Sequence, residues 1–273
     1  MSKQELVSRD LPKVSATPPY AWVRHTPRVL LQQYKVVLLA FLASYRTQWV
    51  MYIIAGILAP LGLILFARSI LGGTTPQQAI FLLGGNMALS IILGPTTFLI
   101  AWLGAAKESK EFDYWIMLPV PKYVVVLAII SVAVIFAFPG LAGTYILGVL
   151  LLGLPFSGGW SLIFLALLSA LSIAGLGVLL GYSVPNPQAA NVVSNLLILV
   201  VAFLSPIMIP ADALPLPLRI ISWIMPSTYA ADAFRSVLAG DVGPGLVVDI
   251  IFLTLSSVLL LSLAQWNLRW RSA

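Results

Sequence analysis

Residues 123–152 read YVVVLAIISVAVIFAFPGLAGTYILGVLLL, a run without a single charged side chain. A helix needs about 20 predominantly apolar residues to cross the hydrocarbon core of a bilayer. The run therefore predicts a membrane-spanning helix rather than the core of a soluble domain. It is longer than a straight span requires, and Pro139-Gly140 near its middle predicts a kink or a break.

The whole chain resembles this stretch in composition. Of its 273 residues, 60% are hydrophobic and 9% are charged, whereas an average globular domain carries roughly 25% charged residues. A water-facing surface cannot be built from this inventory, so we expect an all-α integral membrane protein. Without cysteine the chain has no disulfide framework and no thiol nucleophile. Its one histidine, His25, cannot supply a multi-histidine metal site.

Further apolar blocks bring the expected number of spans to six. They cover residues of about 49–67, 79–103, 123–152, 161–182, 192–209 and 246–266. The block at 29–45 is interrupted by glutamines and a lysine, and its uninterrupted part makes only about 15 Å of helix. This favours an amphipathic helix in the inner interface, with a complete extra span as the alternative. Residues 1–27 are polar and lack the apolar core of a signal peptide, so we expect a flexible cytoplasmic segment.

Lysines and arginines predict the orientation. Twelve of the fifteen lie in the N-terminal stretch, in the loop after the second expected span or at the C-terminus, and the other three are Arg68, Arg219 and Arg235. By the positive-inside rule both termini are cytoplasmic, in agreement with an even number of spans. The basic residues lie beside apolar blocks and form no contiguous patch, so we expect contact with membrane lipid and not with nucleic acid.

A charged loop follows the second expected span. Residues 107–122 hold three of the nine acids and three lysines, then turn apolar and end in Leu118-Pro119-Val120-Pro121. Charged residues followed by an aromatic and apolar face favour a short interfacial helix that docks a soluble partner. The alternative is a solvated loop whose aromatic side chains face lipid.

A second segment, residues 210–241, lies between the last two expected spans on the outer side. Pro226 favours a helix start and Gly240 a helix stop, so the segment divides into two helices that are too short to cross. Such helices can dip into the outer leaflet as a hairpin and still satisfy their own backbones. One face of the second helix carries three polar residues at helical spacing, Tyr229, Asp232 and Arg235. We expect the acid and the arginine to form an ion pair that pins the hairpin, with a direct substrate contact as the alternative.

Reactive side chains are nearly absent from the expected spans. Asp249, near the outer end of the last span, is the only acid there, and its shallow depth favours solvation or pairing over a functional role. The sequence contains no serine–histidine arrangement, no HExxH, no paired-acid motif and no Walker A motif. We therefore expect no catalytic residue and no ATP hydrolysis by this chain alone. The repeats and buried charges typical of a secondary transporter are also missing, so the energy for transport must come from a partner.

At these two segments the sequence resembles the permease subunits of the ABC-2 family of ABC exporters. The outer segment is similar to the family's re-entrant hairpin in the order Ser205-Pro206-Ile207, Pro210, Leu214-Pro215, Pro226, Tyr229, Asp232-Ala233 and Arg235. The charged loop resembles the family's ATPase-contacting segment, although Glu111-Phe112-Asp113-Tyr114 stands where the family often has a Gly-Thr-Leu-Glu-like stretch. The resemblance extends over residues of about 28–273, which form one transmembrane domain in this interpretation.

The resemblance implies a role for each segment. The residues that it marks in the re-entrant hairpin are Pro215, Pro226, Tyr229, Asp232 and Arg235. The residues that it marks for contact with an ATPase are Lys107, Glu108, Lys110, Glu111, Phe112, Asp113, Tyr114, Leu118, Pro119 and Pro121.

The resemblance also implies an assembly. Two permeases, identical or paired with a sister subunit, bind two cytoplasmic ATPase subunits that hold ATP and Mg²⁺, while this chain holds no cofactor or metal of its own. The complex exports hydrophobic or amphipathic cargo, such as a lipid or a drug, across the plasma membrane. A lipid-linked glycan or polysaccharide is the alternative cargo within the family. A membrane-embedded enzyme or scaffold is the alternative outside it.

Overall fold

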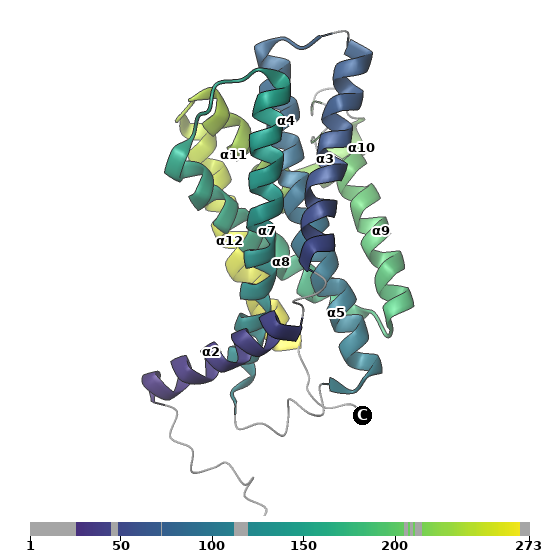
Figure 1. Ribbon diagram of the computed structural model, residues 1–273, viewed down its shortest axis with the longest axis vertical. Coiled ribbons are helices and arrows are strands. Elements are labelled where there is room, and N and C mark those ends of the chain that lie inside the picture. The colour runs from purple at the N-terminus through teal and green to yellow at the C-terminus, as the bar shows by residue number, and fades with distance from the viewer. Residues whose placement is uncertain are drawn as a thin grey trace, which may run out of the picture.

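The computed structural model describes residues 26–44, 49–71, 73–111, 120–204, 207, 210 and 215–267 (Figure 1). Every regular element in these ranges is a helix. The elements are α2 (Pro27–Ser44), α3 (Trp49–Leu71), α4 (Pro76–Ile91), the π-helix η1 (Ile92–Thr96), α5 (Thr97–Glu108), α7 (Lys122–Leu152), α8 (Gly159–Ser183), α9 (Pro187–Leu204), α10 (Leu216–Ser222), α11 (Pro226–Ala239) and α12 (Pro244–Asn267). The N-terminal segment 1–25 lies outside the described residues.

The long apolar blocks of the sequence become the long helices of the bundle. In the described part of the chain, five helical stretches are long and apolar enough to cross a membrane, namely 53–70, 76–108, 122–152, 159–183 and 244–266. The chain is therefore an all-helical, multi-pass membrane protein. The remaining expected span, 192–209, falls on α9, whose described apolar part, 187–201, is shorter. The count of six consequently stays a prediction.

The second span is longer than expected and has a π-turn in its middle. It was expected at 79–103, but α4, η1 and α5 form one helical stretch over 76–108. Thr75 begins it with a capping box, in which its side chain and that of Gln78 each accept from the other's backbone N–H. Pro95 lies inside η1 and has no N–H to donate, which is a usual cause of a π-bulge. The Thr97 hydroxyl donates to the carbonyls of Leu93 and Gly94 and so satisfies part of this turn.

Helix α7 runs unbroken from Lys122 to Leu152, so the break allowed for at Pro139-Gly140 does not occur. Instead Gly140 lies where α3 and α7 approach closely, since a Cβ added at Gly140 would stand 3.4 Å from the Cα of Gly56. The hydroxyls of Ser90 and Thr144 both donate to the Gly56 carbonyl, at 2.7 and 3.0 Å. Small residues and interhelical hydroxyls are the usual means of helix packing in membranes, and they hold α3, α4 and α7 together here.

Helix α2 lies across the end of the bundle at which α5 ends and α7 begins (Figure 1). The Tyr34 hydroxyl donates to Ser131 of α7 at 2.7 Å, and Phe41 makes an edge-to-face contact with Trp102 of α5. Val37 and Phe41 are buried, whereas Val36 and Leu39 are exposed. The helix is not among the five candidate spans of the described residues, so the structure does not support the alternative of an extra span.

Candidate functional site

The segment expected to form the hairpin ends in α11 (Pro226–Ala239), which begins at Pro226 and stops at Gly240 as predicted. Gly240 is its C-cap and has the left-handed conformation. The preceding α10 has only seven residues, and a short turn at 223–225 separates the two helices. Pro215 is the N-cap of α10. Residues 211–214, near the start of the expected hairpin, lie outside the described residues.

Arg235 fastens α11 to two other parts of the chain. Its guanidinium donates to the carbonyl of Phe81 in α4 and to that of Ile207, both at 3.2 Å. It lies 3.7 Å from the centroid of the Phe81 ring, and the expected ion pair with Asp232 is present at 2.7 Å. Burial lowers the pKa of the Arg235 guanidinium, and the Asp232 carboxylate opposes that shift. A cation held largely by backbone carbonyls favours the pinning role over direct substrate contact.

Two glycines of α4 make room for this anchor, and sequence reasoning missed them. A Cβ added at Gly84 would lie 2.6 Å from the Arg235 Cγ, and one added at Gly85 would lie 2.2 Å from the Ile207 carbonyl oxygen. Neighbouring glycines within an apolar block are a signal of close helix approach in membranes. This signal was available in the sequence but did not identify what approaches. We call Gly84, Gly85, Ile207, Asp232 and Arg235 the hairpin anchor.

Tyr229 joins α11 to the last helix. Its ring stacks on that of Phe252 in α12, with centroids 3.7 Å apart, and its hydroxyl donates to the Trp223 carbonyl at 2.8 Å. Burial raises the pKa of the Tyr229 phenol, and the carboxylates of Asp249 and Asp232 raise it further.

Asp249 lies one helical turn before Phe252 and is only 8% exposed. Within the described part of the chain, its carboxyl makes no hydrogen bond or ion pair. Asp249 lies beside α11, which packs against α12, and the expectation that it is solvated or paired stays a prediction.

The loop predicted to contact an ATPase is described only in part. Lys107 lies in the last turn of α5, and its ammonium donates to the carbonyls of Tyr182 and Val184, the latter at 2.7 Å. It thereby caps the C-terminus of α8, where a cation is favourable. Glu108, Lys110 and Glu111 are exposed.

Pro121 is the N-cap of α7. Phe112, Asp113, Tyr114, Leu118 and Pro119 lie outside the described residues. The role of this loop stays a prediction, and the structure ties its first lysine to α8.

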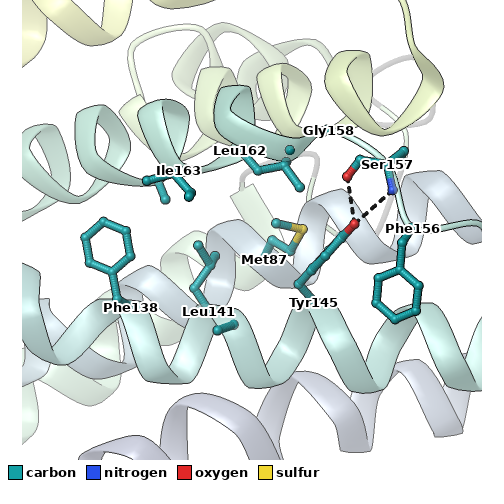
Figure 2. Close-up of a pocket in the computed structure, with 12 residues that line it drawn as sticks. Met87, Phe138, Leu141, Tyr145, Phe156, Ser157, Gly158, Leu162 and Ile163 are labelled. Atoms are coloured by element: carbon teal, nitrogen blue, oxygen red, sulfur yellow. Dashed lines mark hydrogen bonds between the residues drawn. The ribbon is translucent and has the colours of Figure 1, made fainter.

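A cavity of about 470 Å³ lies between α7 and α8, and sequence reasoning did not predict it (Figure 2). Phe138, Leu141 and Tyr145 line it from α7, Leu162 and Ile163 line it from α8, and Met87 of α4 forms its back. The Tyr145 hydroxyl donates to the Ser157 carbonyl at 2.7 Å and accepts from the Ser157 N–H at 3.0 Å. These two bonds fasten the α7–α8 loop across one end of the cavity.

Among the described residues, no three histidine, cysteine or acidic side chains lie close enough to hold a metal ion together. The described part of the chain does hold a set of apolar helices, a fastened outer segment and a basic end. These features define a multi-pass membrane protein.

The comparisons with known proteins identify the kind of membrane protein. The family described as "ABC-2 family transporter protein" matches residues 58–266, and the chain belongs to this family. Over 121 residues it is 31% identical to "Probable multidrug ABC transporter permease YbhS" of Escherichia coli strain K12, and equally to the same protein of strain O157:H7. The match covers 43% of this chain and 32% of each relative, so the chain matches about a third of the length of these curated relatives. No solved structure gives a significant match.

Proposed function

We propose that this chain is the transmembrane subunit of an ATP-driven exporter of hydrophobic or amphipathic cargo. The observation that carries the proposal is the membership of the ABC-2 family, together with described spans that are almost without charge. The acids within these described spans are Glu108, in the last turn of α5, and Asp249, so few acids are available to couple transport to protons in the way of many secondary transporters. The relatives' printed description as probable multidrug permeases supports an amphipathic cargo.

The proposed topology has six spans with both termini in the cytoplasm. In it α9 is the fifth span, α2 lies in the inner interface, and α10 with α11 forms a re-entrant hairpin in the outer leaflet. The charges support this orientation, because Lys107, Lys110 and Lys122 lie at the end of the bundle crossed by α2. Arg68, at the other end of α3, lies on the opposite side.

In the proposed assembly two permeases bind two cytoplasmic ATPase subunits through the loop between α5 and α7. The exposed side chains of Glu108, Lys110 and Glu111 offer charges to such a partner. Lys107 then links the loop to the end of α8, so that a displacement of the loop reaches a second span. ATP and Mg²⁺ would be held by the ATPase.

The test is transport in inside-out vesicles of the plasma membrane that contain this chain and an ABC ATPase subunit that co-purifies with it. We expect ATP-dependent accumulation of a lipophilic fluorescent drug, and no ATP hydrolysis by the purified chain alone. Accumulation without ATP or without the ATPase would refute the proposal. Accumulation of a lipid-linked glycan in place of the drug would favour the alternative cargo.

A further inference from the structure

The cavity between α7 and α8 lies apart from both the hairpin anchor and the ATPase-facing loop. Its back is closed, since Met87, Leu141 and Leu162 are 1%, 6% and 7% exposed. Its front is open, since Phe156 and Ile163 are 63% and 49% exposed. Figure 2 shows the cavity as an elongated space that follows the two helices from Phe138 and Ile163 to Tyr145 and Phe156.

The cavity lies near the ends of α7 and α8 that the α7–α8 loop connects. Tyr145 lies seven residues before the end of α7 at Leu152, about 10 Å along the helix. The α8 residues that line the cavity belong to the first two turns of that helix. On α8 the exposed side chains next to the opening, Phe164 and Leu167, are also apolar. The side chains around the opening are thus apolar and belong to two helices long enough to cross a membrane, which favours contact with lipid over contact with water.

The polar groups of the cavity are already satisfied. Tyr145 and Ser157 bond to each other, and the Ser157 hydroxyl donates to the Leu238 carbonyl at 3.3 Å. A water molecule held in a cavity needs two to four polar partners, and an apolar cavity of about 150 Å³ stays dry and admits benzene. A space of about 470 Å³ without free polar groups accordingly suits a longer apolar ligand.

We propose that this cavity binds one acyl chain of a bilayer phospholipid, which enters through the open front beside Phe156 and Ile163 while its headgroup stays at the membrane surface. Phospholipid chains are the medium into which the cavity opens, and their narrow, flexible shape matches a space elongated along two helices. The Tyr145–Ser157 pair closes the end of the cavity towards the surface. The site depends neither on the exported cargo nor on the ATPase, so it extends beyond the proposed function.

The test is photolabelling of the full-length chain in vesicles of phosphatidylcholine doped with a phosphatidylcholine that carries a diazirine in the middle of one acyl chain. Mass spectrometry then locates the label. We expect peptides that contain Leu141 and Leu162 to carry about tenfold more label than the exposed face of α12 at Leu255 and Val258. Equal labelling of the two surfaces would overturn the site.

A variant with a larger side chain in the cavity tests whether the label depends on the empty space. Ala142 lines the opening from α7, and Ala142→Phe is expected to reduce the label in the cavity about tenfold. Ala59→Phe, at an exposed position of α3, is expected to leave it unchanged. If Ala142→Phe yields no monodisperse protein, Ala142→Leu takes its place with a smaller expected reduction. Undiminished label in the filled variant refutes the proposal, whereas failure of drug transport in vesicles leaves it intact.

Discussion

Helix α4 borders both the hairpin anchor and the cavity between α7 and α8. The space beside the helix is filled at the anchor and empty at the cavity. Because Gly84 and Gly85 have no side chains, Arg235 and the Ile207 carbonyl can pack directly against the backbone of α4. Two residues further on, Met87 forms the back of an open apolar cavity. The hairpin anchor is closed by close contact and by hydrogen bonds to the largely buried Arg235, while the cavity is left for an apolar occupant. The bundle is thus closely packed where α11 is held and open at the cavity.

The largest loss of stability is expected at Gly85, where α4 leaves the least room for a side chain. In Gly85→Ala the new Cβ would lie 2.2 Å from the Ile207 carbonyl oxygen, so the backbone itself must shift. We expect a loss of about 3 kcal/mol in the free energy of unfolding, at the upper end of the cost of overpacking. Chemical unfolding of the purified chain in detergent, followed by tryptophan fluorescence, measures it.

Gly62→Ala is the control, because it makes the same chemical change in α3 with nothing within 4 Å of the added Cβ. Its stability should be unchanged or higher by about 0.5 kcal/mol, since alanine favours the helix. Similar losses in both variants would show that the anchor is not closely packed.

The next largest loss of stability is expected when the guanidinium of Arg235 is removed from the hairpin anchor. Arg235→Met keeps much of the side-chain volume but leaves the carbonyls of Phe81 and Ile207 without their donor. Because unsatisfied buried acceptors are costly, we expect a loss of about 2 kcal/mol in unfolding free energy. In the assembled exporter, drug accumulation should fall as α11 loosens from α4. Normal stability together with lost transport would instead indicate direct contact between Arg235 and cargo.

Properties that depend on local sequence were predictable. Long apolar blocks predict helices wherever they occur, because the bilayer imposes the length. Tyr229, Asp232 and Arg235 share a helical face by their spacing alone, and the ion pair follows from that spacing. The ends of α11 at Pro226 and Gly240 follow from the backbone preferences of proline and glycine.

Properties that depend on neighbours in space were not predictable. The sequence around Pro95 permits a bend, but the π-turn is completed by Thr97 and by the approach of Gly177, where an added Cβ would lie 3.1 Å from the Thr96 Cγ2. The sequence shows two neighbouring glycines at positions 84 and 85. Their contact Arg235 lies about 150 positions away in the chain, so no local pattern relates it to them. A cavity is an absence of side chains between helices, and no local pattern encodes it.

A smaller effect is expected at the cavity. Tyr145→Phe keeps the ring that lines the space but removes both hydrogen bonds to Ser157. We expect a loss of about 1 kcal/mol in the local opening free energy of the α7–α8 loop, and therefore roughly fivefold faster amide hydrogen exchange at Ser157. Tyr123→Phe, at the other end of α7, is the control and should leave that exchange unchanged. Unaltered exchange in Tyr145→Phe would mean that packing alone holds the loop.

The smallest loss of stability is expected for the ion pair between Asp232 and Arg235. It can be compared with the loss of the hydrogen bonds from Arg235 to backbone carbonyls. Asp232 is 47% exposed, and exposed ion pairs contribute only about 0–1 kcal/mol because solvent screens them. In Asp232→Asn the amide oxygen can still accept from Arg235, so we expect a loss of about 0.5 kcal/mol, well below that of Arg235→Met. Unfolding of both variants under one set of conditions gives the comparison. If the two losses are equal, the ion pair holds the outer segment. If Arg235→Met costs several times more, the carbonyls of Phe81 and Ile207 hold it, and the carboxylate mainly orients the guanidinium towards them.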